Sequence, residues 1–259
     1  MRTLIAMPVF NEQKYVTRVL DEVRRYADEV LVIDDGSSDE TPNLLAKQPV
    51  DVIRHAQNRG YGQSLIDAFR WASCYKYDWL ITMDCDEQHE PAALPSFYQA
   101  INNNDADVIS GSRYLQRDVV FANGDITSDG VIDSTEQDSP PADRREINQH
   151  VTAMINDALG LQLTDAFCGY KAYRVSAIRK LQLEETGYAF PLQFWAQAAA
   201  HSLKISELPV KLIYNDPNRS FGGPLDDPEH RIQHYREVFD KEMEKVGGKL
   251  NVGVESTLQ

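Results

Sequence analysis

Short apolar runs that alternate with helical patterns constrain the fold of this chain more than any other feature. The runs lack the polar alternation of a half-exposed strand, as expected for parallel strands that are buried on both faces. Between them, apolar residues recur at the spacing of an amphipathic helix. The runs lie at residues 3–7, 29–33, 52–53 and 79–83. This order predicts an α/β protein with three layers, in which a doubly wound, mostly parallel sheet carries helices on both faces.

The pattern continues beyond residue 90 with one interruption. Helices are predicted at residues 91–101, 143–160, 176–181, 191–201 and 229–245, and strands at residues 108–111 and 205–214. Residues 118–141 contain six acidic and no basic residues, together with Gly and Pro breakers, which predicts a long loop or lid. Residues 123–133 partly match a calcium loop, but the spacing differs and the closing Glu is absent. Residues 246–259 are expected to form a disordered tail.

Composition narrows the class of partner. The net charge of −14 argues against nucleic acid or an anionic membrane surface as the main partner, because both attract basic proteins. Three cysteines, an odd number without metal-type pairing, fit a reducing compartment better than a disulfide scaffold. No apolar run approaches the roughly 20 residues that span a bilayer, and no signal segment precedes the first strand. We therefore expect a soluble, cytoplasmic protein, with peripheral binding at the inner face of the membrane as the alternative.

Two carboxylates follow the fourth predicted strand. Asp84 and Asp86 lie two residues apart, so on an extended backbone both would point to one side, and Gln88 would continue that alternation. Ligands of open α/β sheets bind at the carboxyl ends of the strands. Two carboxylates there suit Mg²⁺, which takes one or two protein carboxylates and leaves its other positions to phosphate and water. Considered alone, however, such a pair is more simply explained as a polar turn that ends a strand.

Five further motifs accompany this pair. The full set is Pro8-Val9-Phe10-Asn11-Glu12, Val32-Ile33-Asp34-Asp35-Gly36-Ser37-Ser38-Asp39, Asn58-Arg59-Gly60-Tyr61-Gly62, Met83-Asp84-Cys85-Asp86-Glu87-Gln88-His89, Gly111-Ser112-Arg113-Tyr114, and the segment from Asp165 to Gly169-Tyr170-Lys171. Together they resemble the motifs of family 2 glycosyltransferases with the A-type fold, in particular the branch of dolichol-phosphate mannose synthase and polyprenyl-phosphate glycosyltransferases. They occur in that family's order and cover most of the chain.

The resemblance implies that the first half of the chain binds a nucleoside-diphosphate sugar, either GDP-mannose or a UDP-sugar. The implied nucleotide-sugar site consists of Pro8, Phe10, Glu12, Asp35, Asn58, Gly62 and Asp84. Asp35 would accept hydrogen bonds from the ribose or the base. Phe10 would offer an apolar face to the base, although core packing would explain Phe10 equally well.

The resemblance also implies a metal site. Asp84, Asp86 and Gln88 would hold Mg²⁺ or Mn²⁺, which would neutralise the leaving nucleoside diphosphate. His89 is expected to have a structural role rather than to bind the metal.

The implied catalytic residues on the acceptor side are Asp165, Arg113 and Arg219. A hydroxyl acceptor needs a general base, for which Asp165 is the candidate. A lipid phosphate is already anionic, so cationic side chains would position it instead, and Arg144 and Arg145 are further candidates for that role. Each arginine could equally be a solvated surface residue.

We therefore expect a metal-dependent, inverting hexosyltransferase with a polyprenyl phosphate as acceptor. Transfer to a sugar or small-molecule hydroxyl is the alternative, because the family's late Arg-Gly…Ser-Lys motif is only loosely matched at residues 219–223. The implied domain covers residues 1–245, and the oligomeric state is left open. Its parts are a nucleotide-sugar half at 3–114, an acidic loop at 115–142, an acceptor half at 143–228 and a C-terminal helix at 229–245.

Other classes of protein fit less well. A sugar-nucleotide pyrophosphorylase would need a Gly-rich, basic loop after the first strand, where this chain has Pro-Val-Phe-Asn-Glu. A P-loop nucleotidase is disfavoured because the chain contains no Gly-x-x-x-x-Gly-Lys-Ser/Thr motif. A non-catalytic nucleotide-sugar-binding protein stays open, because a fold does not determine a function.

Overall fold

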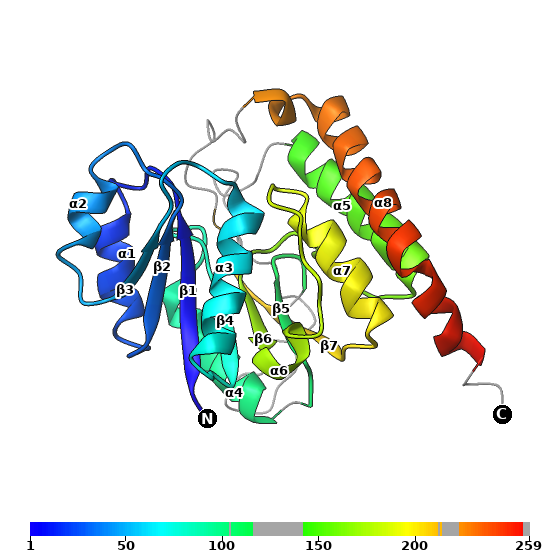
Figure 1. Cartoon of the computed structure of the whole chain (residues 1–259), viewed down its shortest axis with the longest axis horizontal. Helices are drawn as coiled ribbons and strands as arrows, with labels where there is room; N and C mark the ends of the chain where they lie inside the picture. Colours follow the sequence, from blue (N-terminus) through cyan, green and yellow to red (C-terminus); the bar gives the residue numbers. More distant parts are fainter. Residues whose placement is uncertain (104, 116–141, 212, 214–222, 256–259) are drawn as a thin grey trace, which may run out of the picture.

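The computed structural model describes residues 1–103, 105–115, 142–211, 213 and 223–255. Within these residues, seven strands form one sheet in the order β3-β2-β1-β4-β6-β5-β7 (Figure 1). The strands are β1 (Thr3–Val9), β2 (Val30–Asp34), β3 (Asp51–Arg54), β4 (Trp79–Thr82), β5 (Val108–Ser112), β6 (Lys171–Arg174) and β7 (Ile205–Pro209). β6 is antiparallel to β4 and β5, and all other neighbouring strands are parallel. The predicted mostly parallel sheet is confirmed.

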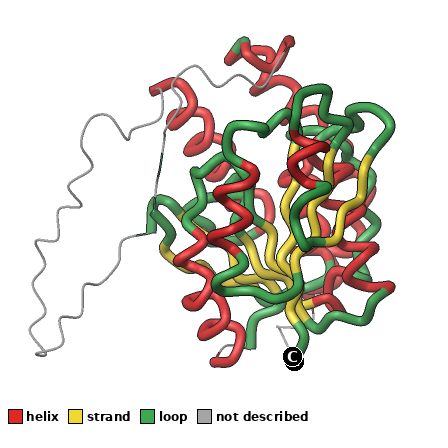
Figure 2. Tube along the Cα trace, turned by 90° about the vertical axis from the view of Figure 1, so that its left-hand side faces the viewer, coloured by secondary structure: helices red, strands yellow, loops and turns green. Residues whose placement is uncertain are grey.

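Helices cover both faces of this sheet (Figure 2). On one face lie α1 (Val16–Val23), α2 (Thr41–Leu45) and α4 (Leu94–Asn103), the last preceded by the short helix η1 (Pro91–Ala93). On the other face lie α3 (Tyr61–Cys74), α5 (Ala142–Leu159), α6 (Val175–Ile178), α7 (Phe190–Ala200) and α8 (Pro228–Glu255), the last preceded by the short helix η3 (Gly223–Asp226). The result is the predicted three-layer arrangement.

The two faces of the sheet explain why its strands lack polar alternation. In β1, Leu4 and Ala6 belong to the core beneath α3, whereas Ile5 and Met7 belong to the core beneath α1 and α4. Side chains alternate between the two faces of a strand, and here both faces are buried. Successive residues of β1 are therefore all apolar.

The ends of two elements differ from the sequence-based prediction. α8 continues to Glu255, although a disordered tail was expected from residue 246. Val246 is buried, so the apolar face that starts at Ile232 extends past the expected end and supports another turn. β7 ends at Pro209, whereas the predicted strand continued to residue 214. Val210 N still donates to Ser112 O at 2.9 Å, so the pairing with β5 continues one hydrogen bond past the proline. The predicted acidic loop and the partial calcium motif lie outside the described residues.

The loops after β1 and β2 are tied together by Asn11. Its backbone has a positive φ of 56°, and its Oδ1 accepts a hydrogen bond from Ser38 N at 2.8 Å. The Asn11 N–H donates to Ser37 Oγ at 2.9 Å. This pairing holds the carboxyl ends of two neighbouring strands in one arrangement.

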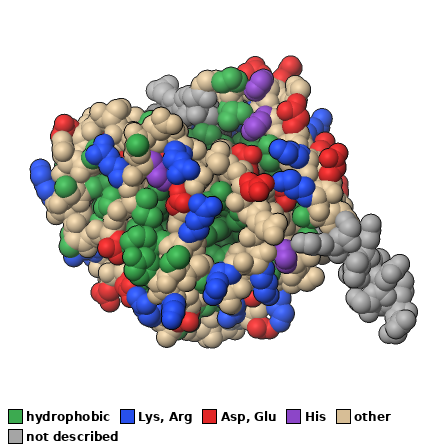
Figure 3. Space-filling model, viewed as in Figure 1, with side chains coloured by type: hydrophobic (Ala, Val, Ile, Leu, Met, Phe, Trp, Pro, Cys, Tyr) green, Lys and Arg blue, Asp and Glu red, His purple; other side chains and the backbone are tan. Residues whose placement is uncertain are grey.

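The face seen in Figure 3 carries both signs of charge, interspersed over its helices. Among the described helices, none combines the length and the apolar character that would be needed to cross a membrane.

Candidate active site

A cleft of about 550 Å³ lies at the carboxyl ends of the strands. β1, β2, β4 and β5 all run toward it, because β5 is antiparallel to β6 and β6 is antiparallel to β4. Its lining residues are Pro8, Val9, Phe10, Glu12, Asp35, Asn58, Gly60, Tyr61, Ser64, Asp84, Cys85, Asp86, Gln88, Arg113, Tyr114, Arg144, Asn148, Phe167, Tyr188, Pro191, Arg231 and Tyr235. The sheet therefore brings most of the residues singled out in the sequence to one place.

Asp35 organises the loop that follows β3. Its Oδ1 lies 2.6 Å from His55 Nδ1 and accepts a hydrogen bond from Arg59 N at 2.8 Å. Its Oδ2 accepts from Gly60 N at 2.9 Å. The other ring nitrogen, His55 Nε2, lies 3.1 Å from Asp67 Oδ2, so the ring bridges two carboxylates. The Asp35 carboxylate thus shapes the loop at residues 58–60 in addition to lining the cleft.

Phe10 does not belong to the core. Its side chain is 45% exposed and lines the cleft beside Pro8, which excludes core packing as the reason for an aromatic residue at this position. An exposed aromatic ring in a polar cleft can stack on a planar ligand such as a nucleobase.

The Asp84–Asp86 pair lies in a turn rather than on an extended backbone. β4 ends at Thr82, and Glu87 has a positive φ of 65°. The turn is held by two contacts: Asp84 N donates to His89 Nδ1 at 2.9 Å, and Gln88 N donates to Asp86 Oδ1 at 2.9 Å. The alternation argument from the sequence was therefore wrong in its geometry, although Asp84, Asp86 and Gln88 all line the cleft.

The Asp84 carboxylate sits against a glycine. A Cβ on Gly169 would lie 2.7 Å from Asp84 Oδ2 and 2.8 Å from the hydroxyl oxygen of Tyr61, closer than real contacts allow. Burial, followed by the charge of Asp84, raises the pKa of Tyr61 well above its usual value, so the hydroxyl stays protonated and can donate to that carboxylate. Gly169 and Tyr61 together fix the position of Asp84.

Asp165 is completely buried and paired with Arg113. The guanidinium donates from Nε to Oδ2 at 2.6 Å and from NH2 to Oδ1 at 2.9 Å. Backbone N–H groups of Arg113, Phe167 and Cys168 donate to the same carboxylate at 3.1–3.2 Å. Burial disfavours the charged carboxylate, but the guanidinium outweighs it, and the pKa of Asp165 is lowered. Asp165 does not line the cleft itself, whereas its partner Arg113 does.

Gly60 and Gly62 pack against the chain before α7. A Cβ on Gly60 would lie 2.3 Å from Thr186 O, and one on Gly62 would lie 2.3 Å from Glu185 O. Gln63 N donates to Thr186 O at 3.1 Å. Gly62, which we expected in the nucleotide-sugar site, does not line the cleft, and its lack of a side chain serves this close approach instead.

Two helices close the far side of the cleft, and the sequence indicated only part of this wall. Arg144 on α5 was a candidate, whereas Arg231 and Tyr235 on α8 and Tyr188 before α7 were not. Tyr235 lies on the buried face of the helix that was predicted at residues 229–245, but no local motif indicated what it would meet. Arg219 lies outside the described residues.

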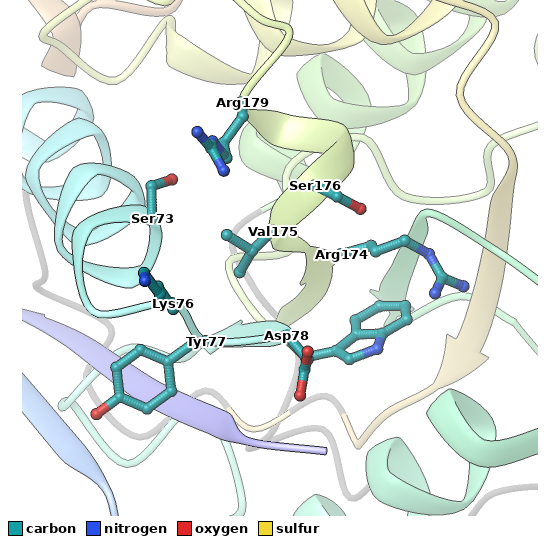
Figure 4. A pocket seen from close by; sticks show the side chains of 9 residues that line it. Ser73, Lys76, Tyr77, Asp78, Arg174, Val175, Ser176 and Arg179 are labelled. Carbon is teal, nitrogen blue, oxygen red and sulfur yellow. The ribbon is translucent and has the colours of Figure 1, made fainter.

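A second hollow, of about 290 Å³, lies at the other end of β4 (Figure 4). It is lined by Ser73, Lys76, Tyr77, Asp78, Trp79, Arg174, Val175, Ser176 and Arg179. Arg174 pairs with Asp107 at 3.2 Å and stacks on Trp79 at 4.8 Å from the ring centre. None of the predicted site residues lies there, and we assign it no function.

The fold and the cleft define a glycosyltransferase of the A type. The solved structure of glucosyl-3-phosphoglycerate synthase from Mycobacterium tuberculosis, in complex with Mn²⁺, UDP and glucosyl-3-phosphoglycerate, superposes with a TM-score of 0.67. That match covers 95% of this chain and 80% of the other at 15% identity, which establishes the fold.

The protein belongs to glycosyl transferase family 2, whose family model matches residues 4–182. Undecaprenyl-phosphate mannosyltransferase of Micrococcus luteus is 30% identical over 230 residues, which are 85% of this chain and 87% of that protein. Polyprenol monophosphomannose synthase of Mycolicibacterium smegmatis is 26% identical over 220 residues, 81% of this chain and 76% of that protein. The predicted family and enzyme class are thus confirmed.

Proposed function

We propose that this glycosyltransferase moves a hexose from a nucleoside-diphosphate sugar to a phosphate acceptor, with a polyprenyl phosphate preferred. The observation that carries the choice of acceptor is the state of Asp165. A general base needs a lone pair aimed at the proton that it removes and a pKa near the working pH. The Asp165 carboxylate instead accepts from five N–H groups, and its pKa is lowered.

A phosphate acceptor needs no such base, because it already carries negative charge. What it needs is a fixed cation, and the Arg113 guanidinium is held in one orientation by its two hydrogen bonds to Asp165. We assign Arg113 to the acceptor phosphate and Asp165 to the positioning of Arg113. Arg144 lines the same side of the cleft and would act with it.

The donor would occupy the opposite side of the cleft. Phe10 would stack on the base, and the loop shaped by Asp35 would hold the nucleoside beside Asn58. Placed between these two sides, the anomeric carbon would meet the acceptor phosphate on the face opposite the leaving diphosphate. That in-line arrangement inverts the configuration at the anomeric carbon.

The residues at the centre of the cleft fit a hard divalent cation. Asp84 and Asp86 offer carboxylate oxygens, and Gln88 an amide oxygen, on a turn that faces the cleft. A hard cation such as Mg²⁺ takes one or two protein carboxylates and fills its other positions with phosphate and water, so this set of oxygens would be enough to hold it. When bound, Mg²⁺ or Mn²⁺ would neutralise charge on the leaving diphosphate. The chain's part is to hold Asp84 in place through Gly169 and Tyr61.

A panel of donors and acceptors tests this proposal. GDP-mannose, UDP-glucose and UDP-N-acetylglucosamine, each radiolabelled in the sugar, would be incubated with the protein, Mn²⁺ and polyprenyl phosphate. We expect a butanol-extractable product with one donor. The matched control is the corresponding polyprenol, which lacks the phosphate and should give none. Product only with sugar or small-molecule hydroxyls would instead support the alternative acceptor class.

This proposal also places the protein at a membrane surface while it works. A polyprenyl phosphate stays in the bilayer, so the chain would bind peripherally at the cytoplasmic face. Sedimentation with vesicles that contain the acceptor, compared with vesicles that lack it, measures that binding.

A further inference from the structure

The charged residues of the cleft are segregated by sign. Its acidic residues in the described chain are Glu12, Asp35, Asp84 and Asp86, and all four follow β1, β2 or β4. The basic residues that line it are Arg113, Arg144 and Arg231, which follow β5 or lie on α5 and α8. The basic side chains of the cleft thus lie on other elements than its acidic ones, and one of them, Arg113, is paired with Asp165.

Arg231 is the least expected member of this wall. It lies in the first turns of α8, and it is only 3% exposed although it borders the cleft. Its NH1 donates to Leu225 O at 3.2 Å, which orients one edge of the guanidinium toward the start of the helix. The guanidinium is thus held at the border of the cleft, where a ligand that enters the cleft can contact it.

Tyr235, one turn further along α8, connects Arg231 to the rest of the wall. Its ring lies 5.2 Å from that of Phe167, two residues after Asp165. Burial raises the pKa of Tyr235 to about 12, while the charges of Arg231 and Arg144 act in the opposite direction. The hydroxyl is therefore protonated at neutral pH and can donate a hydrogen bond, and Tyr235 lines the same cleft as Arg231 and Arg144.

α8 is rigidly attached to the domain. Glu242, which is buried, accepts hydrogen bonds from Gln193 Nε2 at 2.7 Å and from Gln197 Nε2 at 2.8 Å, both on α7. The helix also runs along α5 (Figure 1). Arg231 and Tyr235 thus lie on a helix that is packed against two others.

We propose that Arg231 and the Tyr235 hydroxyl form a phosphate subsite on α8 that binds the acceptor, with Phe167 and Tyr188 as the aromatic wall beside it. This inference rests on the proposed function, since it takes the acceptor to be a phosphate monoester. The shared chemistry is a dianionic phosphate with an organic substituent, from either a polyprenyl lipid or a water-soluble monoester. A guanidinium binds such a phosphate through two parallel N–H groups, and a phenol adds a third donor.

The competing explanation is that Arg231 only anchors the start of α8 through Leu225 O. The two roles separate in kinetics. If Arg231 binds the acceptor phosphate, loss of its side chain raises the KM for the acceptor and leaves the KM for the donor sugar nucleotide unchanged. A loosened helix lowers the thermal midpoint and impairs both substrates together.

The test uses the full chain and the variants Arg231→Gln, Arg231→Lys and Tyr235→Phe. Arg236→Gln is the matched control, because Arg236 is exposed on the same helix and contacts His150 outside the cleft. Initial rates would be measured against polyprenyl phosphate and against glycerol 3-phosphate. Calorimetric titration with inorganic phosphate would measure anion binding independently of transfer.

We expect Arg231→Gln to raise the acceptor KM by about 10- to 100-fold, the value of one charged hydrogen-bonding partner. Arg231→Lys should recover part of that loss, Tyr235→Phe should show a smaller rise, and Arg236→Gln should match the wild type. An effect with polyprenyl phosphate alone would identify the lipid as the ligand, and an equal effect with glycerol 3-phosphate would identify the phosphate itself.

An acceptor KM within twofold of the wild-type value in both Arg231→Gln and Tyr235→Phe would overturn the subsite. A parallel loss for donor and acceptor with a lowered thermal midpoint, not relieved by Arg231→Lys, would establish the anchoring role instead. If the wild type transfers sugar to no phosphate, the proposed function fails. The subsite would still stand if inorganic phosphate binds the wild type and not Arg231→Gln.

Discussion

His55 Nδ1 lies 2.6 Å from Asp35 Oδ1, and the other nitrogen of the same ring lies 3.1 Å from Asp67 Oδ2. The imidazole, which we call the His55 brace, therefore links the end of β2 to α3. Because Asp35 also accepts from Arg59 N and Gly60 N, this brace reaches the loop that borders the proposed nucleoside site.

Replacing His55 by Ala should weaken nucleotide binding. The buried Asp35 carboxylate would lose a hydrogen-bonding partner worth about 1.5–3 kcal/mol and would no longer hold the loop at residues 58–60 in one position. We expect an increase of about tenfold or more in the Kd of the preferred nucleoside diphosphate, measured by calorimetry with GDP and UDP. Arg70→Ala is the control, because it removes only an exposed contact with Asp67. Equal affinities in His55→Ala and the wild type would show that His55 is not needed to hold this loop for nucleotide binding.

Nucleotide binding should depend on a divalent metal through Asp86. With Mn²⁺ present, Asp86→Asn should bind nucleoside diphosphate at least tenfold more weakly than the wild type, because an amide is a poorer ligand for a hard cation than a carboxylate. Without metal, the two proteins should bind equally weakly. Calorimetry in EDTA and in Mn²⁺ makes the comparison, and full-strength binding by the variant in EDTA would refute the metal assignment.

Gly169→Ala should damage the metal site more than the fold. The new methyl group would lie 2.7 Å from Asp84 Oδ2 and 2.8 Å from the Tyr61 hydroxyl oxygen, so it would displace the partly exposed carboxylate from the position that Tyr61 helps to hold. We expect the concentration of Mn²⁺ required for half-maximal activity to rise several-fold, while the thermal midpoint changes by little. Gly247→Ala on α8, where nothing lies within 4 Å, should leave the metal requirement unchanged and stabilise the helix by up to about 1 kcal/mol.

Asp165→Asn should destabilise the fold by about 3–5 kcal/mol, because it leaves the Arg113 charge largely buried without its partner. The lowered pKa of Asp165 also predicts how the stability of the fold changes with pH. In the wild type, the pair contributes stability that is fully present above the unfolded-state pKa of about 3.9 and is lost as the pH falls through the folded-state pKa. Urea unfolding between pH 2 and pH 7 should show that acid dependence in the wild type and a weaker one in Asp165→Asn. Identical pH profiles would show that the pair does not titrate as proposed.

Features that depend on neighbouring residues could be predicted from the sequence. The buried strands follow from apolar runs, and parallel strands necessarily bring their carboxyl ends together. That Phe10 and Asp35 belong to the same site as Asp84 was implied by the resemblance to the family, and all three line the cleft.

Features that depend on distant packing could not be predicted. The turn after β4 requires a positive φ at Glu87, a residue type that gives no indication of it. Arg231 and Tyr235 enter the cleft because α8 docks on α5 and α7. The pattern of α8 shows which face is buried but not which element it meets. The pairing of Asp165 with Arg113 likewise joins residues 52 positions apart.

The glycines at residues 60 and 62 fit against the chain at 185–186, and that segment is held by Gln193, whose side-chain oxygen accepts from Glu184 N and Glu185 N. Gln193 in turn donates to Glu242 on α8. During synthesis, the loop that carries these glycines therefore leaves the ribosome about 180 residues before the helix that supports it. The donor site that we propose would therefore be complete in a nascent chain only after the last helix docks.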